Sequence, residues 1–100
     1  MQGINVIDYS TLAVSSSAVD LITNGSPTLP SKAKRAYITC ETAAVRWRAD
    51  GTPPDADEGH MLAKDDSISF LSANFRQLLE KIEFIADTVT AGALKITYFD

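Results

Sequence analysis

Short segments in which apolar and polar residues alternate one by one are the feature that most limits how this chain can fold. They occur at residues 36–40, 45–49 and 94–99, and each alternation places its apolar side chains on one face of a strand. Clusters of Gly, Pro, Asn, Asp and Ser interrupt such segments at intervals of roughly 8 to 12 residues. The pattern predicts a single all-β domain over residues 1–100, an antiparallel β-sandwich or small barrel of about seven to eight short strands. The long helices of an α/β fold are not predicted.

The N-terminal part of the chain is expected to supply two or three short strands, from alternations at residues 4–6 and 12–14 and an apolar run at 19–22. The three serines at 15–17 are interpreted either as a bend or as the exposed face of an edge strand, because their hydroxyls can bond nearby backbone groups. Dense turn signals at 23–31 predict a loop.

A hairpin is expected in the middle of the chain. Residues 36–40 and 45–49 alternate with opposite parity, and the parity changes within residues 41–44. A connection of this length suits a hairpin. We therefore predict that the two segments pair as antiparallel neighbours, and that Ile38 and Trp47 share the buried face.

Residues 75–86 fit both helical and strand spacing, because their apolar positions recur first at every third or fourth residue and later at every second residue. We divide them into one or two helical turns at residues 74–79 and a strand at 81–86. The other elements expected in this half of the chain are a polar turn at 64–67, a strand at 68–70, a turn at 88–92 and a last strand at 94–99.

A strand that runs into a long polar loop is the most distinctive segment. Alternation places Trp47 on one face of this strand, and Arg46 and Arg48 on the other. Trp47 is interpreted as a core residue, with a sugar-stacking platform as the alternative. The two arginines are expected to cover a neighbouring strand and to pair with a carboxylate such as Asp50 or Glu83. The alternative is that they bind an anionic ligand in bidentate fashion.

The loop after this strand has its own backbone signals. Asp50 and Gly51 predict a turn, because Asp tolerates unusual backbone angles and Gly has no Cβ to clash at positive φ. Pro53 and Pro54 remove two backbone donors and fix φ, so no β-ladder continues through them and the loop is expected to be stiff. The structural motif of strand and loop comprises Arg46, Trp47, Arg48, Asp50, Gly51, Pro53, Gly59 and His60.

The composition of the chain argues against two classes of partner, nucleic acids and membranes. The net charge of −4, from 9 basic and 13 acidic residues, argues against nucleic acid, because neutralising phosphates requires a concentrated basic face. No apolar run approaches the roughly 18 residues that span a bilayer, and no leader pattern opens the chain. We therefore expect a soluble product of the cytoplasm with no membrane partner. The single cysteine, Cys40, cannot form an internal disulfide and is expected to be a buried, inert thiol.

His60 stands near Asp55, Asp57 and Glu58, and one interpretation is a general base oriented by carboxylates. No nucleophile motif accompanies it, and a histidine where a loop meets a strand is expected instead to bond backbone carbonyls. The four carboxylates within residues 50–58 raise the alternative of a Ca²⁺ site, but their order does not match an EF-hand and the prolines limit wrapping. We expect a solvated acidic loop, with no enzyme activity, cofactor or metal.

Four segments together resemble small virion structural proteins of tailed bacteriophages and prophages. They are A-Y-I-T-C-E at residues 36–41, V-R-W-R-A-D-G-T-P-P at 45–54, G-H-M-L at 59–62 and L-K-I-T-Y-F at 94–99. Proteins of this kind often carry R-x-R-x-D-G-T-x-P, then G-H-x-L, and close on a strand that ends in V-T-Y-like residues. Pro54 departs from this pattern, because a Thr often follows the first Pro there.

The resemblance implies a compact β domain that serves as an accessory piece of a phage head or tail. Such a piece acts through self-association into a homo-oligomer and through docking on other phage structural proteins, in a virion built in the host cytoplasm. The alternative is a small carbohydrate- or surface-binding β module, in which Trp47, Tyr37 or Tyr98 is exposed for stacking. An exposed flat apolar patch favours assembly, whereas aromatic side chains along a groove favour ligand binding.

Overall fold

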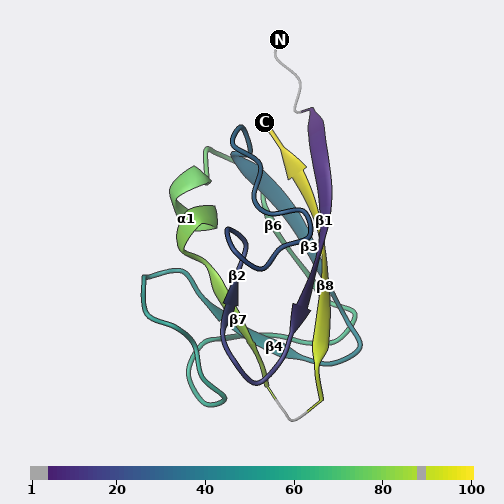
Figure 1. Ribbon diagram of the computed structural model, residues 1–100, viewed down its shortest axis with the longest axis vertical. Helices are drawn as coiled ribbons and strands as arrows, with labels where there is room; N and C mark the ends of the chain where they lie inside the picture. The colour runs from purple at the N-terminus through teal and green to yellow at the C-terminus, as the bar shows by residue number, and fades with distance from the viewer. Residues whose placement is uncertain (1–4, 88–89) are drawn as a thin grey trace.

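The computed structural model describes residues 5–87 and 90–100, which fold into eight strands and one short helix (Figure 1). In chain order the elements are β1 (Val6–Val14), β2 (Val19–Asp20), β3 (Arg35–Glu41), β4 (Val45–Arg48), β5 (His60–Leu62), β6 (Ser67–Phe70), α1 (Arg76–Lys81), β7 (Glu83–Ala86) and β8 (Gly92–Phe99). No helix in these residues is long and apolar enough to cross a membrane. The prediction of an all-β sandwich with one short helical turn is confirmed.

The strands form two four-stranded antiparallel sheets. We name them the first sheet, in the order β1-β8-β3-β6, and the second sheet, in the order β2-β7-β4-β5. The last strand of the chain, β8, lies between β1 and β3, and the long strands β1 and β8 run side by side in Figure 1. Most neighbours in the sheets are therefore distant in sequence.

Apolar side chains of both sheets meet between them and form the core. Ile38 on β3 and Ile96 on β8 are register partners, and neither is exposed to solvent. The second sheet contributes the fully buried Val45 and Phe84. Burying a large aliphatic or aromatic side chain stabilises the folded state by roughly 1.5–3 kcal/mol. This shared layer is what holds the two sheets together.

The N-terminal region forms one long strand where two short ones were predicted, although residue 4 of the first predicted strand lies outside the described residues. β1 pairs with β8 from Val6 opposite Phe99 to Val14 opposite Gly92, with one register irregularity near its start. Because β8 supplies a continuous partner, the polar residues at 8–11 stay in the ladder. The serines at 15–17 lie in the bend that leads to the two-residue strand β2.

The predicted hairpin between residues 36–40 and 45–49 is wrong. β3 pairs with β8 and β6, whereas β4 pairs with β5 and β7. Residues 42–44 therefore carry the chain from one sheet to the other, with Thr42 at a φ of 78°. A change of parity suits this crossover as well as it suits a hairpin. Ile38 and Trp47 do pack into the same core, but from opposite sheets.

The short helix begins two residues later than predicted. It spans Arg76–Lys81 instead of residues 74–79, and the strand that follows it begins at Glu83. The Arg76 guanidinium donates hydrogen bonds to the carbonyls of Pro30 and Ala33. These contacts with a distant loop hold the first residue of the helix, and no local pattern in the sequence indicates them.

The remaining local predictions agree with the structure where it describes them. The polar turn at residues 64–67 contains Asp65 at a φ of 71°, and β6 follows it. The expected loop at residues 23–31 contains no strand apart from an isolated bridge at Ser26. The predicted turn at 88–92 lies partly outside the described residues.

Candidate functional site

β4 presents Trp47 and its flanking arginines on opposite faces of the second sheet. Trp47 is the register partner of the fully buried Phe84 on β7 and of His60 on β5, so its side chain points toward the core. Arg46 is paired in register with Met61, which is 49% exposed on the outer face. The strand thus separates an aromatic inner side from a cationic outer side.

Trp47 is only partly buried, and its indole lies between the core and the surface. Its ring centroid is 4.7 Å from that of His60, with the planes tilted by 39°. The ring of Phe70 meets the indole in a T-shaped contact, with a centroid distance of 5.8 Å and an interplanar angle of 84°. The expectation that Trp47 packs against the core is confirmed, but the ring also forms part of a surface feature.

That feature is an open hollow of about 450 Å³ where β4 runs into the loop. Its lining includes Trp47, Arg48, Asp50, Glu58, Gly59 and His60. The structure therefore brings together five of the eight residues of the predicted motif. Arg46, Gly51 and Pro53 do not line the hollow, whereas Glu58 does and was not part of the motif.

The ion pair of Arg48 and Asp50 forms one side of the hollow. Two hydrogen bonds join the groups, Nε to Oδ1 at 3.1 Å and Nη2 to Oδ2 at 2.5 Å. Hydrogen bonding to the carboxylate raises the pKa of Arg48, and the guanidinium in turn lowers the pKa of Asp50. Because the two charges neutralise each other, this side of the hollow offers oriented polar atoms with little net charge.

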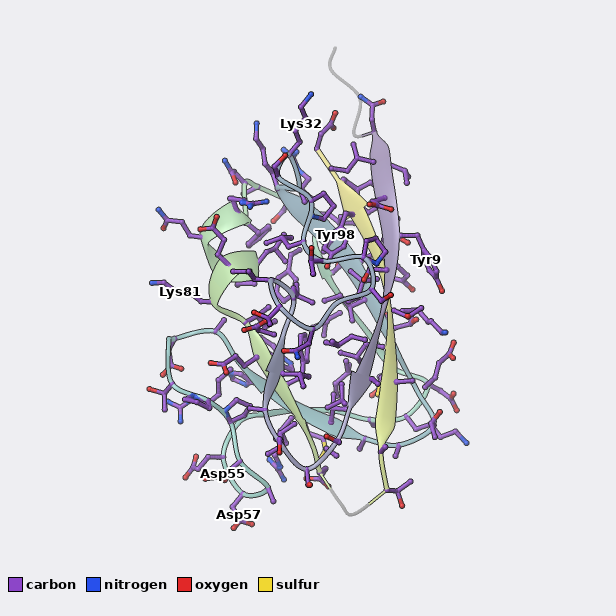
Figure 2. The ribbon with its side chains drawn as sticks, in the orientation of Figure 1. Tyr9, Lys32, Asp55, Asp57, Lys81 and Tyr98 are labelled. Carbon is purple, nitrogen blue, oxygen red and sulfur yellow. The ribbon has the colours of Figure 1, made fainter. Side chains whose placement is uncertain are left out.

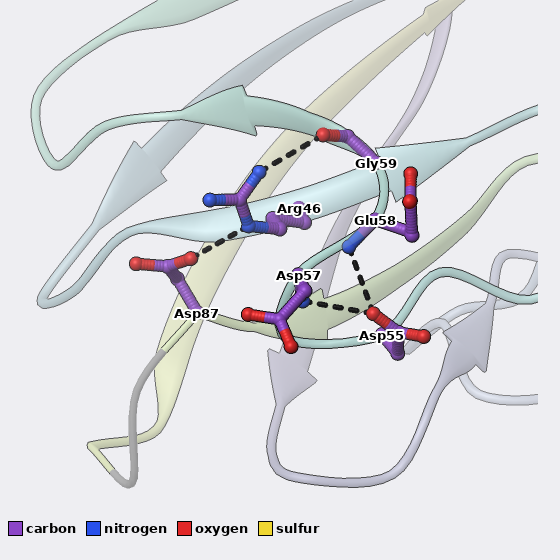
Figure 3. Close-up of polar contacts among 6 residues, drawn as sticks. All are labelled: Arg46, Asp55, Asp57, Glu58, Gly59 and Asp87. Carbon is purple, nitrogen blue, oxygen red and sulfur yellow. Dashed lines mark hydrogen bonds and ion pairs between the residues drawn. The ribbon is translucent and has the colours of Figure 1, made fainter.

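Arg46 connects three strands on the outer face (Figure 3). Its Nε donates to Oδ1 of Asp87 at 2.7 Å, and its Nη1 donates to the carbonyl of Gly59 at 3.1 Å. Asp87 directly follows β7, and Gly59 directly precedes β5, so one guanidinium fixes the far end of the loop to the sheet. Sequence reasoning named Asp50 and Glu83 as partners for the arginines and missed Asp87, because the pairing of β4 with β7 was not foreseen.

A turn around Asp55 shapes the tip of the loop. One oxygen of the Asp55 side chain accepts hydrogen bonds from the backbone N–H groups of Asp57 and Glu58, both at 2.8 Å (Figure 3). The neighbouring Pro54 is buried against the protein although it belongs to the loop. Gly51 has a φ of 90°, as the turn prediction requires. The loop is therefore held by its own backbone contacts and by packing.

Gly59 occupies a position where a larger residue would be strained and crowded. Its φ is 137°, and a Cβ added there would lie 3.1 Å from the carbonyl oxygen of Trp47 and 3.2 Å from the Cβ of Pro54. The close approach brings the end of the loop against β4. Glu58 and His60, on either side of Gly59, are thereby placed at the hollow.

His60 is exposed, and its imidazole makes no hydrogen bond to another described residue. The expectation that it bonds backbone carbonyls is wrong, since its contact is with the indole ring. Within residues 5–87 and 90–100, no group of three or more His, Cys, Asp or Glu side chains is arranged to hold a metal ion. The Asp55 carboxylate instead bonds its own loop.

Cys40 is buried on β3, as predicted, with 1% of its surface exposed. Its Sγ lies 3.2 Å from the carbonyl of Ala43, to which the thiol donates. Burial raises the pKa of the thiol, and the carboxylates of Asp66, Asp65 and Glu41 act in the same direction. A thiol in such a place is a poor nucleophile.

A second surface, which sequence reasoning did not single out, is the outer face of the first sheet. The strand registers place Tyr9, Thr97, Tyr37 and Ser69 in one row across its four strands. Tyr9 is 52% exposed and Tyr37 is 40% exposed. The next row consists of Thr11, Lys95, Thr39 and Ser67.

Tyr98, a suggested stacking residue, cannot serve that purpose because none of its surface is exposed. Figure 2 shows it inside the molecule, whereas Tyr9 projects outward from β1. The Tyr98 hydroxyl has no hydrogen-bond partner among the described residues. The nearby Ser10 hydroxyl donates instead to the carbonyl of Pro27 at 2.6 Å. Burial raises the pKa of Tyr98 to about 12.

Comparison of the chain with protein-family models, with curated proteins and with solved structures found no match. The resemblance to phage virion proteins thus rests on the motif residues of the chain itself.

Proposed function

We propose that this chain is a structural protein of a tailed-bacteriophage or prophage virion, an accessory component of the head or tail. It acts by self-association into a homo-oligomer and by docking on other virion proteins. The phage assignment rests on the motif around residues 45–62. The assembly role rests on one observation, the outer face of the first sheet, where Tyr9 and Tyr37 lie in one row and are 52% and 40% exposed.

The composition of this face supports a protein contact. Tyr9 and Tyr37 flank Thr97 in one row, and Lys95 is the one charged residue in the two central rows. Tyrosine is enriched at protein interfaces because it combines a large apolar surface with a hydroxyl group, whereas charged residues are depleted from interface centres. Hydroxyl groups from threonine and serine give such a face additional hydrogen-bonding capacity.

The outer face of the second sheet has a different character. Arg46 and Arg48 extend from β4 there and are engaged in ion pairs with Asp87 and Asp50. Both pairs keep some contact with water, and removing that water on docking costs free energy. The contrast between the two faces favours the first sheet as the docking surface.

Docking through the face is also favoured over pairing along the β1 edge of the first sheet. The edge strand β1 exchanges two backbone hydrogen bonds with Ser26, Thr11 N–H to the Ser26 carbonyl at 3.1 Å and Ser26 N–H to the Thr11 carbonyl at 3.0 Å. The loop that contains Ser26 therefore covers the middle of this edge. A covered edge resists the addition of a further strand.

Light scattering tests the proposal by measuring solution mass at several protein concentrations, first for the protein alone and then in mixtures with the proteins encoded beside it. The proposal predicts a defined oligomer or a stoichiometric complex with one of those proteins. A monomer at every concentration that binds none of them would overturn it.

A carbohydrate- or surface-binding module is the second candidate. The observation that favours it is the position of Trp47 and His60 at an open hollow with polar walls. Tyr98 no longer contributes to this candidate because it is buried.

A further inference from the structure

The hollow beside β4 combines an aromatic wall with hydrogen-bonding groups that the fold does not use. Trp47 and His60 form the aromatic wall, with ring centroids 4.7 Å apart. The indole N–H of Trp47 has no hydrogen-bond partner among the described residues, yet it is not sealed from solvent. The imidazole of His60 and the carboxylate of Glu58 likewise make no hydrogen bond to another described side chain or backbone group.

A second part of the lining supplies polar atoms in a fixed arrangement. Arg48 and Asp50 both line the hollow, and two hydrogen bonds hold the guanidinium against the carboxylate. Both groups retain unused capacity, because a guanidinium has five N–H donors and a carboxylate accepts about four hydrogen bonds. Adjacent donors and acceptors of this kind match the neighbouring hydroxyl groups of a polyol.

Charge selects among the ligands that fit such a site. Arg48 is neutralised by Asp50, while Glu58 and the nearby loop residues Asp55 and Asp57 add negative charge. An anionic ligand is therefore disfavoured. A wholly apolar ligand would leave the polar rim without partners, which costs binding free energy. A metal cation is disfavoured as well, because within residues 5–87 and 90–100 no group of three or more His, Cys, Asp or Glu side chains is arranged to hold one.

A neutral sugar meets these conditions. A pyranose ring has C–H faces that pack on aromatic rings and hydroxyl groups that bond to carboxylate, guanidinium and imidazole groups. The volume of about 450 Å³ falls in the range of roughly 300–1,000 Å³ that is usual for small-molecule sites. We propose that the hollow lined by Trp47, Glu58 and His60 binds a neutral saccharide, with the Arg48–Asp50 pair as its polar wall.

The site is also held in shape before any ligand arrives. The Asp55 side chain fixes the backbone of Glu58 at 2.8 Å, and the Glu58 carboxylate points away from Asp55 in Figure 3. Arg46 holds the carbonyl of Gly59 at 3.1 Å from the other side. A preformed site saves the entropy cost of ordering a loop on binding. Asp55 is in this sense a positioning residue.

Tryptophan fluorescence is the direct readout, because Trp47 is the only tryptophan of the chain. The full chain is titrated with glucose, galactose and N-acetylglucosamine, and with their β-linked disaccharides. We expect at least one of these sugars to change the emission saturably, with a Kd in roughly the millimolar range. Glucuronic acid, the carboxylate counterpart of glucose, is expected to bind more weakly than glucose.

Two variants and two controls locate the site. Glu58→Ala and His60→Ala alter exposed residues, so both variants should fold, and each is expected to weaken binding about tenfold. Asp57→Ala changes an exposed neighbour that does not line the hollow, and Tyr37→Glu changes the opposite sheet. Both controls are expected to bind like the parent protein.

The proposal is overturned if none of these neutral sugars alters the emission at about 50 mM, a concentration well above a millimolar Kd. It is equally overturned if Glu58→Ala and His60→Ala bind as the parent does, or if glucuronic acid binds more tightly than glucose. None of these results bears on self-association, which is measured separately by solution mass.

Discussion

Gly51 and Gly59 carry the backbone conformations on which the loop between β4 and β5 depends. Both have positive φ, 90° and 137°. They differ in their surroundings, because a Cβ on Gly51 would meet nothing within 4 Å, whereas one on Gly59 would press on Trp47 and Pro54. A substitution at Gly51 therefore measures the free-energy cost of backbone strain without a contribution from steric crowding.

Gly51→Val is expected to lower the free energy of unfolding by about 1–3 kcal/mol, because a β-branched residue at positive φ is strained. Urea denaturation followed by circular dichroism measures the change. Gly51→Asn should recover part of the loss, since Asn tolerates this region. Thr52→Val, at the next exposed position, is the matched control. A Gly51→Val variant that unfolds at the parent's urea concentration would refute the turn assignment.

Because of Tyr98, the free energy of unfolding is expected to fall at alkaline pH. Its hydroxyl is buried without a partner, and burial raises its pKa from 10.0 to about 12. The unfolded state therefore loses this proton first as the pH rises. Below pH 10 the ionisation of Tyr98 does not affect the free energy of unfolding. As the pH rises from 10 to 12, that free energy falls, and the loss reaches about 2 kcal/mol at pH 12.

Tyr98→Phe removes both this dependence and an unsatisfied polar group. We expect the variant to be at least as stable as the parent at pH 7, and to lose less stability than the parent between pH 10 and 12. Urea denaturation of both proteins at a series of pH values measures the difference. Equal losses in the two proteins would show that Tyr98 does not titrate in the folded state as described.

At the level of elements, the loop of residues 49–59 is organised by two side chains from different sides. Asp55 bonds the loop to itself, and Arg46 fixes the loop's end to β4 and to Asp87 after β7. The hollow beside Trp47 exists because this loop ends in a defined position. A substitution that changes the conformation of this loop is therefore expected to change the shape of the hollow.

Asp55→Ala is expected to destabilise the protein only slightly, by about 0.5–1.5 kcal/mol, because the residue is exposed and two hydrogen bonds are lost. The local effect should be larger, since the backbone N–H of Asp57 loses its acceptor and that of Glu58 keeps only the longer hydrogen bond of 3.3 Å to the Asp55 carbonyl. Amide hydrogen exchange by NMR is expected to be faster at these two positions.

Asp57→Ala is the control for that change, because the acceptor in the turn is Asp55 and the backbone N–H of residue 57 is retained. It should leave both exchange rates near those of the parent. Unchanged exchange in Asp55→Ala would contradict the turn described around Asp55.

At the scale of the whole molecule, local patterns predicted the elements better than their pairing. The alternations around β3, β4 and β8 identified strands, because a strand with one buried face has an apolar residue at every second position. The turn at Gly51 was also predictable, since its chemistry is local. The β-sandwich class followed from the number and spacing of such segments.

Pairing between distant strands could not be predicted in the same way. The chain crosses between sheets at residues 42–44, and parity alone does not distinguish this crossover from a hairpin. The ion pair of Arg46 with Asp87 depends on the neighbouring positions of β4 and β7, and so does the end of the loop that shapes the hollow. The row of Tyr9 and Tyr37 likewise appears only when β1, β8 and β3 are side by side.

Charge placed on the outer face of the first sheet tests most directly whether this face is the assembly surface that we propose. Tyr37→Glu places a charge in the middle of that face, and Met61→Glu places the same charge at a similarly exposed position on the second sheet, where the native residues are 40% and 49% exposed. Solution mass by sedimentation equilibrium is measured for the parent and both variants. We predict that the parent and Met61→Glu form the same oligomer, whereas Tyr37→Glu is monomeric at those concentrations. Equal masses for all three proteins would contradict it.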